Sequence, residues 1–370
     1  MAQSHLHLRC GVTVGLETVA AIAGKRSRYA TAAGNGGRNR PSRRGTQHDD
    51  DGGMRMSRKG GSGYVGRVAG GWRASLATVL KDHNGVKQGG SVASAATQDK
   101  RADVLYASFE RLREMEYRLN DVTGLREKHV QALMADLHAR GMSASTLQNT
   151  LSILRTFAEW IGKAGMVQGI EQYLGEGVAE RTSIAKEDKS WTAKGVDSAT
   201  KIAEVRERDP RVAIQLELSQ AFSLRAREAM QLRPHIADKG THLSVSHGTK
   251  GGRDRTVPIA TAAQREVLDR AKALCATKAS STGDQAMKLH QWKNHFYRVV
   301  RACGISRADG FTVHGLRHQY ANDRYKELSG QDSPVRGGET VEKSMDKTVR
   351  LIVAEELGHS RESITNYYLG

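Results

Sequence analysis

The spacing of apolar residues limits the fold of this 370-residue chain more than any other feature. From about Arg101 onward, apolar side chains recur at three- and four-residue intervals, which is the period of an amphipathic α-helix. Only between Leu243 and Ile259 do they alternate with polar residues, as in a half-buried strand. We therefore predict a mostly α fold with one small antiparallel β-sheet.

The first seventy residues show neither period. Residues 34–40 and 59–63 consist of glycine, asparagine, serine and basic residues. Such a segment buries too little apolar surface to offset the entropy lost on ordering. Residues 1–70 are therefore predicted to be a low-complexity basic tail. Two interpretations are open, a disordered basic arm or a start assigned too early, with synthesis beginning at Met54 or Met56, and the composition favours the second.

A helical domain is predicted over residues 95–175. Its three helices are marked by apolar residues at helical spacing: Val104, Leu105, Phe109, Leu112 and Met115; Val130, Leu133, Met134 and Leu137; Leu147, Leu151, Leu154, Phe157 and Ile161. Gly141 is a suitable C′ residue for the second helix, and Ser143 or Ser145 can cap the third. The polar stretch over residues 176–190 is predicted to be an interdomain linker.

The second predicted domain covers residues 191–370. Helical patterns lie at residues 197–208, 210–222, 225–232, 261–279, 284–302, 314–328 and 346–357, with a short helix from about Ser360. The alternating segment forms a predicted β-hairpin, with Gly251 and Gly252 at its tip.

The amino-acid composition limits the classes of function that this chain can have. Lysine and arginine total 57 against 40 acidic residues, a net charge of +17. This excess indicates a polyanionic partner, most often nucleic acid, although charge that only maintains solubility is an alternative. The cysteines Cys10, Cys275 and Cys303 form neither a disulfide framework nor a zinc module, so a reducing intracellular compartment is expected. No stretch reaches the roughly 18 to 20 apolar residues of a membrane span, so no membrane partner is predicted.

Four separated segments carry residues suited to chemistry, at residues 221–232, 248–258, 314–318 and 356–370. Each is weak alone. An Arg-x-x-Glu pair on a helix is usually a surface ion pair, and a lysine beside a turn is usually solvated. His-x-x-Arg places two cations on one helix face, which is unfavourable unless an anion binds there. A terminal tyrosine is more often a packing residue than a nucleophile.

Together, in this order and spacing, the four segments resemble the tyrosine recombinases, or phage-integrase family. The resemblance covers residues 191–370, and more loosely the helical domain, which resembles the family's core-binding (SAM-like) domain. The ending from Glu356 resembles integrases of bacterial mobile elements. The resemblance implies a two-domain, C-shaped clamp around DNA.

The resemblance also assigns site residues. Those matching catalytic positions are Arg225, Lys250, His314, Arg317, His359 and Tyr368. Glu228 matches the acidic residue that follows the first arginine. Tyr367 is one residue short of the usual spacing from His359, so Tyr368 is the preferred nucleophile.

The chemistry of these residue types agrees with the assignment. Arg225 and Arg317 can clamp phosphate oxygens with forked, charge-assisted hydrogen bonds, and His359 can add a further donor. His314 is the candidate base for the tyrosine and Lys250 the candidate acid for the leaving oxygen. The expected product is a 3′-phosphotyrosine, formed without metal, ATP or another cofactor.

The function implied is site-specific recombination, integrating or excising a mobile element. Its partners would be double-stranded DNA attachment sites, further copies of the chain in a tetramer on DNA, and accessory DNA-bending or excision-directing proteins. The expected location is the nucleoid in the bacterial cytoplasm. The alternatives are a decayed or truncated integrase that only binds DNA, a type IB topoisomerase-like enzyme and, least favoured, a basic protein serving RNA or ribosomes.

Several features depart from the family's pattern. Ser223 stands where a glycine is common, and residues 327–348 form an apparent insertion, predicted to be a surface loop. Two residues follow Tyr368, so assembly through other surfaces, or truncation, is expected. Arg253 and Arg255 are interpreted as tracking phosphate or as a solvated hairpin face. His290 and His318 are interpreted as structural or solvent-facing.

Overall fold

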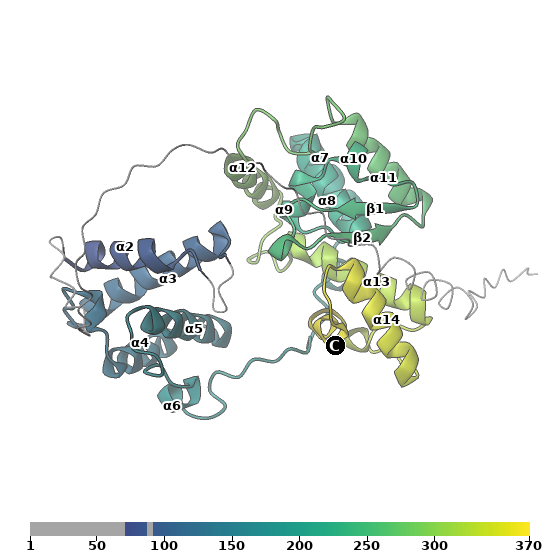
Figure 1. Ribbon diagram of the computed structural model, residues 1–370. Helices are drawn as coiled ribbons and strands as arrows, with labels where there is room; N and C mark the ends of the chain where they lie inside the picture. The colour runs from purple at the N-terminus through teal and green to yellow at the C-terminus, as the bar shows by residue number, and fades with distance from the viewer. Residues whose placement is uncertain (1–70, 87–91) are drawn as a thin grey trace, which may run out of the picture. The chain divides into compact units, whose positions relative to one another are not determined.

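The computed structural model describes residues 71–86 and 92–370 (Figure 1). Residues 1–70, with the predicted basic tail and Cys10, and residues 87–91 lie outside the described residues. The described chain is helical almost throughout and contains one two-stranded antiparallel sheet. The predicted fold class, mostly α with a small antiparallel sheet, is confirmed. In the part described, no helix has both the length and the apolar character needed to cross a bilayer.

The N-terminal helices form a bundle around one apolar core. Its helices are α2 (Gly71–His83), α3 (Ala95–Glu114), α4 (Glu127–Ala139), α5 (Ala144–Trp160) and the short α6 (Ile170–Leu174). Helix α2 lies in a stretch that the sequence left unassigned, and it contributes Trp72 and Leu76 to the core. Ser143 is the N-cap of α5, and Gly141 has a positive φ of 71° just beyond α4.

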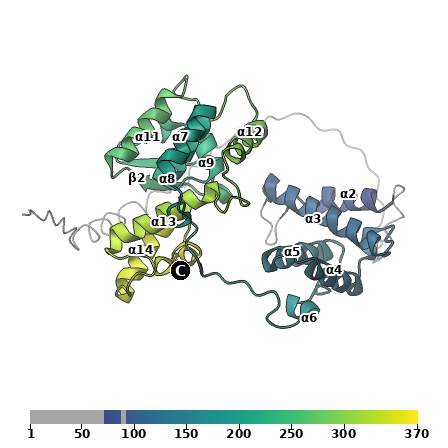
Figure 2. The same cartoon turned by 180° about the vertical axis from the view of Figure 1, so that it is seen from behind.

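The C-terminal helices pack around α8 (Pro210–Phe222), which contacts α7 (Ser198–Arg208), α11 (Ala262–Ala273) and α13 (Val313–Ser329) (Figure 2). Nine of the 13 residues of α8 are buried, and three of these, Gln215, Glu217 and Ser219, are polar. The remaining helices are α9 (Ala226–Gln231), α10 (Pro234–Ala237), α12 (Leu289–Ala302), α14 (Lys343–Glu356) and α15 (Asn366–Leu369).

The predicted hairpin is present. Strand β1 (His242–Val245) pairs with β2 (Arg255–Pro258), with Leu243 opposite Val257. The 3₁₀ turn η4 (Lys250–Gly252) lies between the strands. The buried face of the hairpin consists of Leu243, Val245, Arg255 and Val257, which follows the strict alternation of a strand.

The helix boundaries differ from the expected ones in two places. The helix expected over 261–279 ends earlier in the structure, at Ala273, and the helix expected over 284–302 begins later, at Leu289. The serine-, threonine- and glycine-containing stretch between them forms turns, and its residue Thr282 donates to the Leu232 carbonyl. The expected terminal helix is divided into the 3₁₀ turn η6 (Glu362–Thr365) and helix α15.

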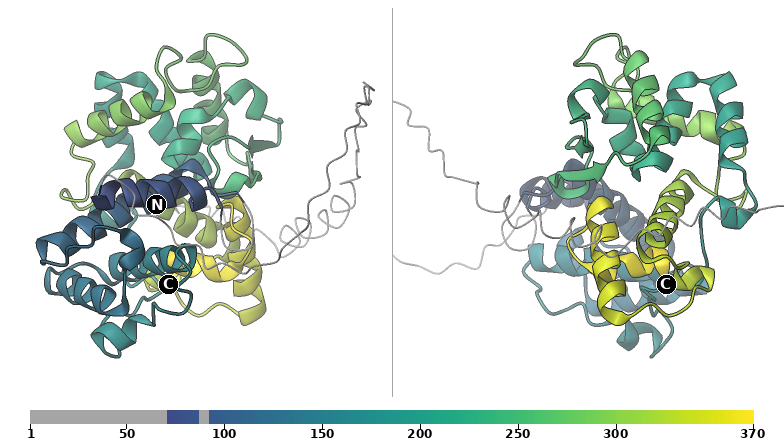
Figure 3. Two further views of the ribbon diagram at one scale, coloured as in Figure 1. Left: turned by 60° about the vertical axis from the view of Figure 1, so that its left-hand side comes forward. Right: turned by 90° about the vertical axis from the view of Figure 1, so that its right-hand side faces the viewer.

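The expectation of a surface loop over residues 327–348 is wrong at both ends of this segment, which are helical, and at Ser333, which is buried. Helix α13 continues to Ser329, a 3₁₀ turn η5 (Pro334–Arg336) follows, and α14 begins at Lys343. Ser333 is completely buried, and its hydroxyl donates a hydrogen bond to the Asn322 side chain inside the domain. The turn η6 packs against α14, and α15 packs against α13; this part of the chain is coloured yellow-green to yellow (Figure 3).

Candidate functional site

The C-terminus of helix α8 forms one side of the candidate site. The carbonyl of Ser223, the residue that ends this helix, accepts hydrogen bonds from Arg317 Nη1 at 2.5 Å and from Arg255 Nη2 at 3.0 Å. Carbonyls at a helix C-terminus lack intrahelical partners and carry partial negative charge. Guanidinium groups are therefore well matched to this position.

The C-terminus of helix α14 forms the opposite side. The Leu357 carbonyl accepts from Arg225 Nη2 at 3.2 Å and also from Arg317 Nη2, while the Glu356 carbonyl accepts from Arg255 Nη1. Two helix ends thus hold three arginines in one cluster. Two of them, Arg225 and Arg317, are the pair assigned to phosphate binding from the sequence.

Glu228 neutralises part of this charge. Its carboxylate accepts from Arg225 Nη1 at 2.6 Å, from the Arg225 backbone N–H at 2.8 Å and from Arg255 Nη2 at 2.7 Å. Burial alone would raise the pKa of Glu228, but the charges of Arg255 and Arg225 hold that pKa below its ordinary value. The Arg-x-x-Glu motif therefore forms a partly buried ion pair between Arg225 and Glu228. The Arg225 side chain keeps 22% of its surface exposed, so part of the guanidinium is open to a ligand.

Arg255 corrects the interpretation made from the sequence. It neither tracks phosphate nor lies on a solvated face, because only 6% of its surface is exposed. Its guanidinium donates hydrogen bonds to Ser223, Glu228 and Glu356. Since residues 255 and 257 point to the same face of β2, the alternation beside buried Val257 was the signal that could have predicted this.

Tyr368 contacts the arginine cluster directly. Arg317 Nε donates to Tyr368 Oη at 3.2 Å, and the guanidinium carbon lies 5.8 Å from the ring centroid. Burial lowers the pKa of Arg317 to about 10, and the charges of Arg225 and Arg255 act in the same direction. Tyr368 is 7% exposed, whereas Tyr367 is 51% exposed.

Three histidines surround this cluster. The His314 and His318 rings lie 5.9 and 4.7 Å from the Tyr368 ring centroid, and 5.2 Å from one another. Loss of hydration, assisted by nearby positive charges, lowers the pKa of His314 to about 4, although this residue is exposed. The same causes lower the pKa of His318 to about 3 and that of His359 to about 4. All three are therefore neutral near pH 7.

Two of these histidines retain an unused ring nitrogen. His359 Nε2 and His318 Nδ1 are buried and have no hydrogen-bond partner. His359, assigned from the sequence as a further phosphate donor, thus has an unpaired nitrogen beside the arginines. His318 is buried against Tyr368, a position that the sequence did not resolve.

Lys250 lies on turn η4 and is exposed. Its positive charge is close enough to lower the pKa of His359. The structure thus brings five of the sequence-predicted residues into one set of contacts, with Lys250 on the adjoining hairpin. Among residues 71–86 and 92–370, no cluster of three His, Cys, Asp or Glu side chains offers a metal site.

Two protein-family models match parts of the chain. Residues 182–323 match the model of a family described as integrase, and residues 76–167 match one described as phage integrase, N-terminal. A relative, tyrosine recombinase XerC of Rhizobium meliloti (strain 1021), is 28% identical over 262 residues, covering 68% of this chain and 75% of the relative. The chain belongs to the tyrosine recombinase, or phage integrase, family.

Solved structures of tyrosine recombinases share the fold. A lambda integrase dimer bound to a COC′ core site has a TM-score of 0.52 and 18% identity, covering 81% of this chain and 95% of that chain. Tn1549 transposon integrase in complex with a circular intermediate DNA has a TM-score of 0.50 and 12% identity, covering 80% and 94%.

Proposed function

We propose that this tyrosine recombinase cuts and rejoins double-stranded DNA at specific attachment sites, and so integrates or excises a mobile element. One observation carries the proposal: the hydroxyl of Tyr368 is hydrogen-bonded to Arg317, which shares the Leu357 carbonyl with Arg225. A nucleophile and two phosphate-binding guanidiniums therefore occupy one site. The DNA complexes of lambda and Tn1549 integrases agree with a DNA substrate.

The arginines would bind the scissile phosphate. As the attacking oxygen approaches, negative charge grows on the non-bridging oxygens. Arg225 and Arg317 are held by carbonyls and Glu228, so their remaining N–H groups need little reorganisation to meet that charge. The free Nε2 of His359 adds a third donor when this nitrogen carries the ring proton.

Two proton transfers would complete the cleavage. Tyr368 Oη forms a bond to phosphorus and loses its proton to neutral His314, directly or through water. The bond from phosphorus to the 5′-oxygen breaks, and that oxygen takes a proton from Lys250. The products are a 3′-phosphotyrosine and a free 5′-hydroxyl. Attack by the 5′-hydroxyl of a partner strand reverses the step, so the chemistry consumes no ATP and uses no metal.

The same chemistry sets the assembly. Exchange between two duplexes requires two cuts in each duplex, and each subunit supplies one tyrosine, so four copies are needed on DNA. Accessory DNA-bending or excision-directing proteins would set the direction. The site of action would be the bacterial nucleoid. Affinity for DNA should fall steeply with salt, because phosphate contacts release bound counterions.

A nicked duplex containing the candidate attachment site tests the proposal. Cleavage next to the nick releases a short fragment, which traps the covalent protein–DNA adduct. We expect an SDS-resistant adduct with the wild type and Tyr367→Phe, and none with Tyr368→Phe. Tight, salt-sensitive binding without any adduct in the wild type would contradict the proposal and indicate a protein that only binds DNA. Relaxation of a plasmid lacking the site would instead indicate a topoisomerase.

A further inference from the structure

Helix α15, which carries Tyr368, contains only four residues. A helix this short has almost no stability of its own. The position of the tyrosine is therefore determined by the elements that hold the main chain of α15. Three such contacts come from parts of the chain that the proposed chemistry does not use.

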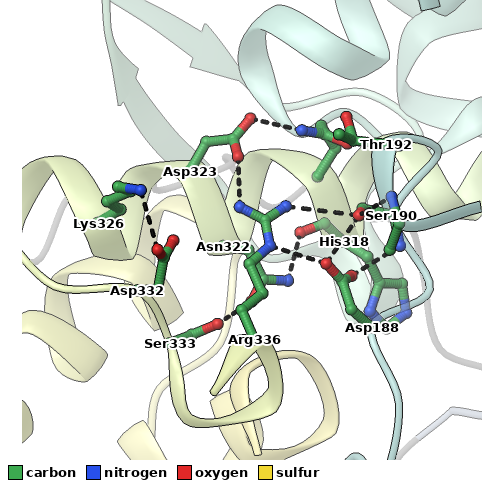
Figure 4. A network of polar contacts seen from close by, with 12 residues as sticks. Asp188, Ser190, Thr192, His318, Asn322, Asp323, Lys326, Asp332, Ser333 and Arg336 are labelled. Atoms are coloured by element: carbon green, nitrogen blue, oxygen red, sulfur yellow. Dashed lines mark hydrogen bonds and ion pairs between the residues drawn. The ribbon is translucent and has the colours of Figure 1, made fainter. Parts of the chain in front are cut away.

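Asn322 provides the first contact. It is completely buried on α13, and its Nδ2 donates to the Tyr368 carbonyl at 3.2 Å and to the His318 carbonyl at 2.9 Å. Its Oδ1 accepts from the Ser333 hydroxyl in the inserted segment (Figure 4). Both amide hydrogens and the oxygen are in use, which fixes the orientation of this side chain.

The inserted segment itself provides the second contact. Gly370 packs so closely on turn η5 that a Cβ at this position would lie 3.0 Å from the Val335 backbone nitrogen. Arg336 holds turn η5 in place by donating hydrogen bonds to Asp188 at 2.7 Å and to Asp323 at 2.7 Å. Asp188 is nearly buried, and Arg336 together with two hydrogen bonds from Ser190 holds its pKa below the ordinary value despite the opposing effect of burial.

The linker provides the third contact. The Ala185 backbone N–H donates to the Asn366 carbonyl of α15 at 2.7 Å, three residues before Asp188. Closer to its start, the linker is bonded to the helical bundle, because Arg181 donates to the Ser145 carbonyl at 3.0 Å. Residues 182–184 alone separate these two sets of contacts. A displacement of the bundle would therefore pull on the segment that holds α15.

We propose that Asn322, Ser333 and Arg336 are positioning residues that hold the Tyr368 helix and link its placement to the 176–190 linker. The inference rests on the proposed role of Tyr368. These side chains act on the α15 main chain and on the linker, not on DNA. Their loss should slow cleavage while DNA affinity stays unchanged, since a misplacement of about 1 Å can cost roughly a hundredfold in rate.

Single-turnover cleavage of the nicked duplex and DNA affinity, measured on the same variants, separate these effects. Arg336→Ala should slow adduct formation tenfold or more, with a DNA Kd within twofold of the wild type. Arg336→Lys keeps one ion pair and should recover part of the rate. Ser333→Ala leaves the Asn322 oxygen unpaired and should slow the same step by a smaller factor.

Lys326→Ala serves as a control, and a pair of substitutions at Ala185 provides a further test with its own control. Lys326→Ala removes an exposed ion pair with Asp332, near the same segment, and should cleave like the wild type. Ala185→Pro removes the N–H that bonds to Asn366, whereas Ala185→Gly keeps it, so only the proline should slow cleavage. Circular dichroism and thermal melting verify that each variant is folded.

The outcomes separate the two proposals. If the wild type forms an adduct and both Arg336→Ala and Ser333→Ala cleave at its rate, the positioning role is overturned and the proposed function stands. Equal losses of affinity and cleavage would also overturn it, since they would indicate a direct DNA contact. A wild type that forms no adduct would overturn both proposals.

Discussion

Arg317 donates to the hydroxyl oxygen of Tyr368 at 3.2 Å while its two other nitrogens are held by the Ser223 and Leu357 carbonyls. The guanidinium is thus fixed by main-chain atoms of two helix ends before any DNA is bound. Because the tyrosine oxygen accepts this bond, its own O–H remains available to a base. The charge that would meet the phosphate and the oxygen that would attack it are therefore preorganised together.

The backbone of Ser223 predicts that a glycine would stabilise the protein. Ser223 has φ 54° and ψ 32°, a left-handed conformation that costs a non-glycine residue about 1–2 kcal/mol, and its buried hydroxyl has no partner. Ser223→Gly removes both penalties at the cost of a more flexible unfolded chain. We expect the free energy of unfolding in urea to rise by about 1 kcal/mol.

Ser219→Gly is the matched control for this substitution. Ser219 lies inside α8, where its hydroxyl donates to the Gln215 carbonyl at 2.7 Å. Glycine there should lower the free energy of unfolding by at least about 0.5 kcal/mol. Equal destabilisation by the two substitutions would contradict the strain assigned to Ser223.

Arg255 and Arg253 flank the same aspartate but should respond in opposite ways to alanine. Arg255→Ala leaves Glu228 with Arg225 as its one charged partner in a buried site and removes a donor from the Ser223 and Glu356 carbonyls, so the free energy of unfolding should fall by about 3–5 kcal/mol. Arg253 is exposed, and its replacement should change stability by less than about 0.5 kcal/mol. Urea unfolding of both variants measures the difference, and a loss below about 1 kcal/mol for Arg255→Ala would count against its structural role.

The depressed histidine pKa values predict acid sensitivity. His314, His318 and His359 have pKa values of about 4, 3 and 4 in the folded protein, against 6.5 ordinarily. Between pH 6.5 and about 4 the unfolded chain therefore binds more protons, and the free energy of unfolding falls as the pH falls. His318→Phe removes one such group. Its stability should change less between pH 6.5 and 4.5 than that of the wild type, and identical slopes would contradict the assignment.

Periodicity predicted the fold class and the hairpin, whereas the residues of the candidate site came from the resemblance to the tyrosine recombinases. Periodicity succeeded where the determining forces are local, as in the alternation around Val257 or the serine cap of α5 at Ser143. The sequence did not reveal that Ser223 has a strained backbone, because a positive φ cannot be read from the pattern of residue types.

The other features that were predicted wrongly depend on contacts between segments that are distant in the sequence. Arg255 was interpreted from its neighbours on the hairpin tip, whereas its partners at 223 and 356 come from two other helices. The insertion looked like a polar loop because its polar residues are satisfied from within, Ser333 by Asn322 and Arg336 by the linker's Asp188. No pattern of residue types in one segment predicts such pairing.

The position of Lys250 on an exposed turn predicts a cleavage defect that depends on the leaving group. Lys250→Met removes the proposed proton donor, so cleavage of an ordinary duplex should fall by about a hundredfold or more. If the bridging 5′-oxygen is replaced by sulfur, the leaving thiolate needs no proton, because its pKa is near 8.5. The variant should then cleave the sulfur-containing duplex at close to the wild-type rate.

Single-turnover rates on the two duplexes measure this rescue. Tyr368→Phe serves as the control, since loss of the nucleophile should abolish cleavage of both duplexes. If Lys250→Met lowers the cleavage rate of both duplexes by the same factor, the lysine binds or orients DNA and does not protonate the leaving group. Arg225→Lys is a second comparison, because the guanidinium is needed to stabilise charge on the phosphate whichever atom departs. Sulfur should therefore rescue Lys250→Met but not Arg225→Lys, which would separate proton donation from stabilisation of charge on the phosphate.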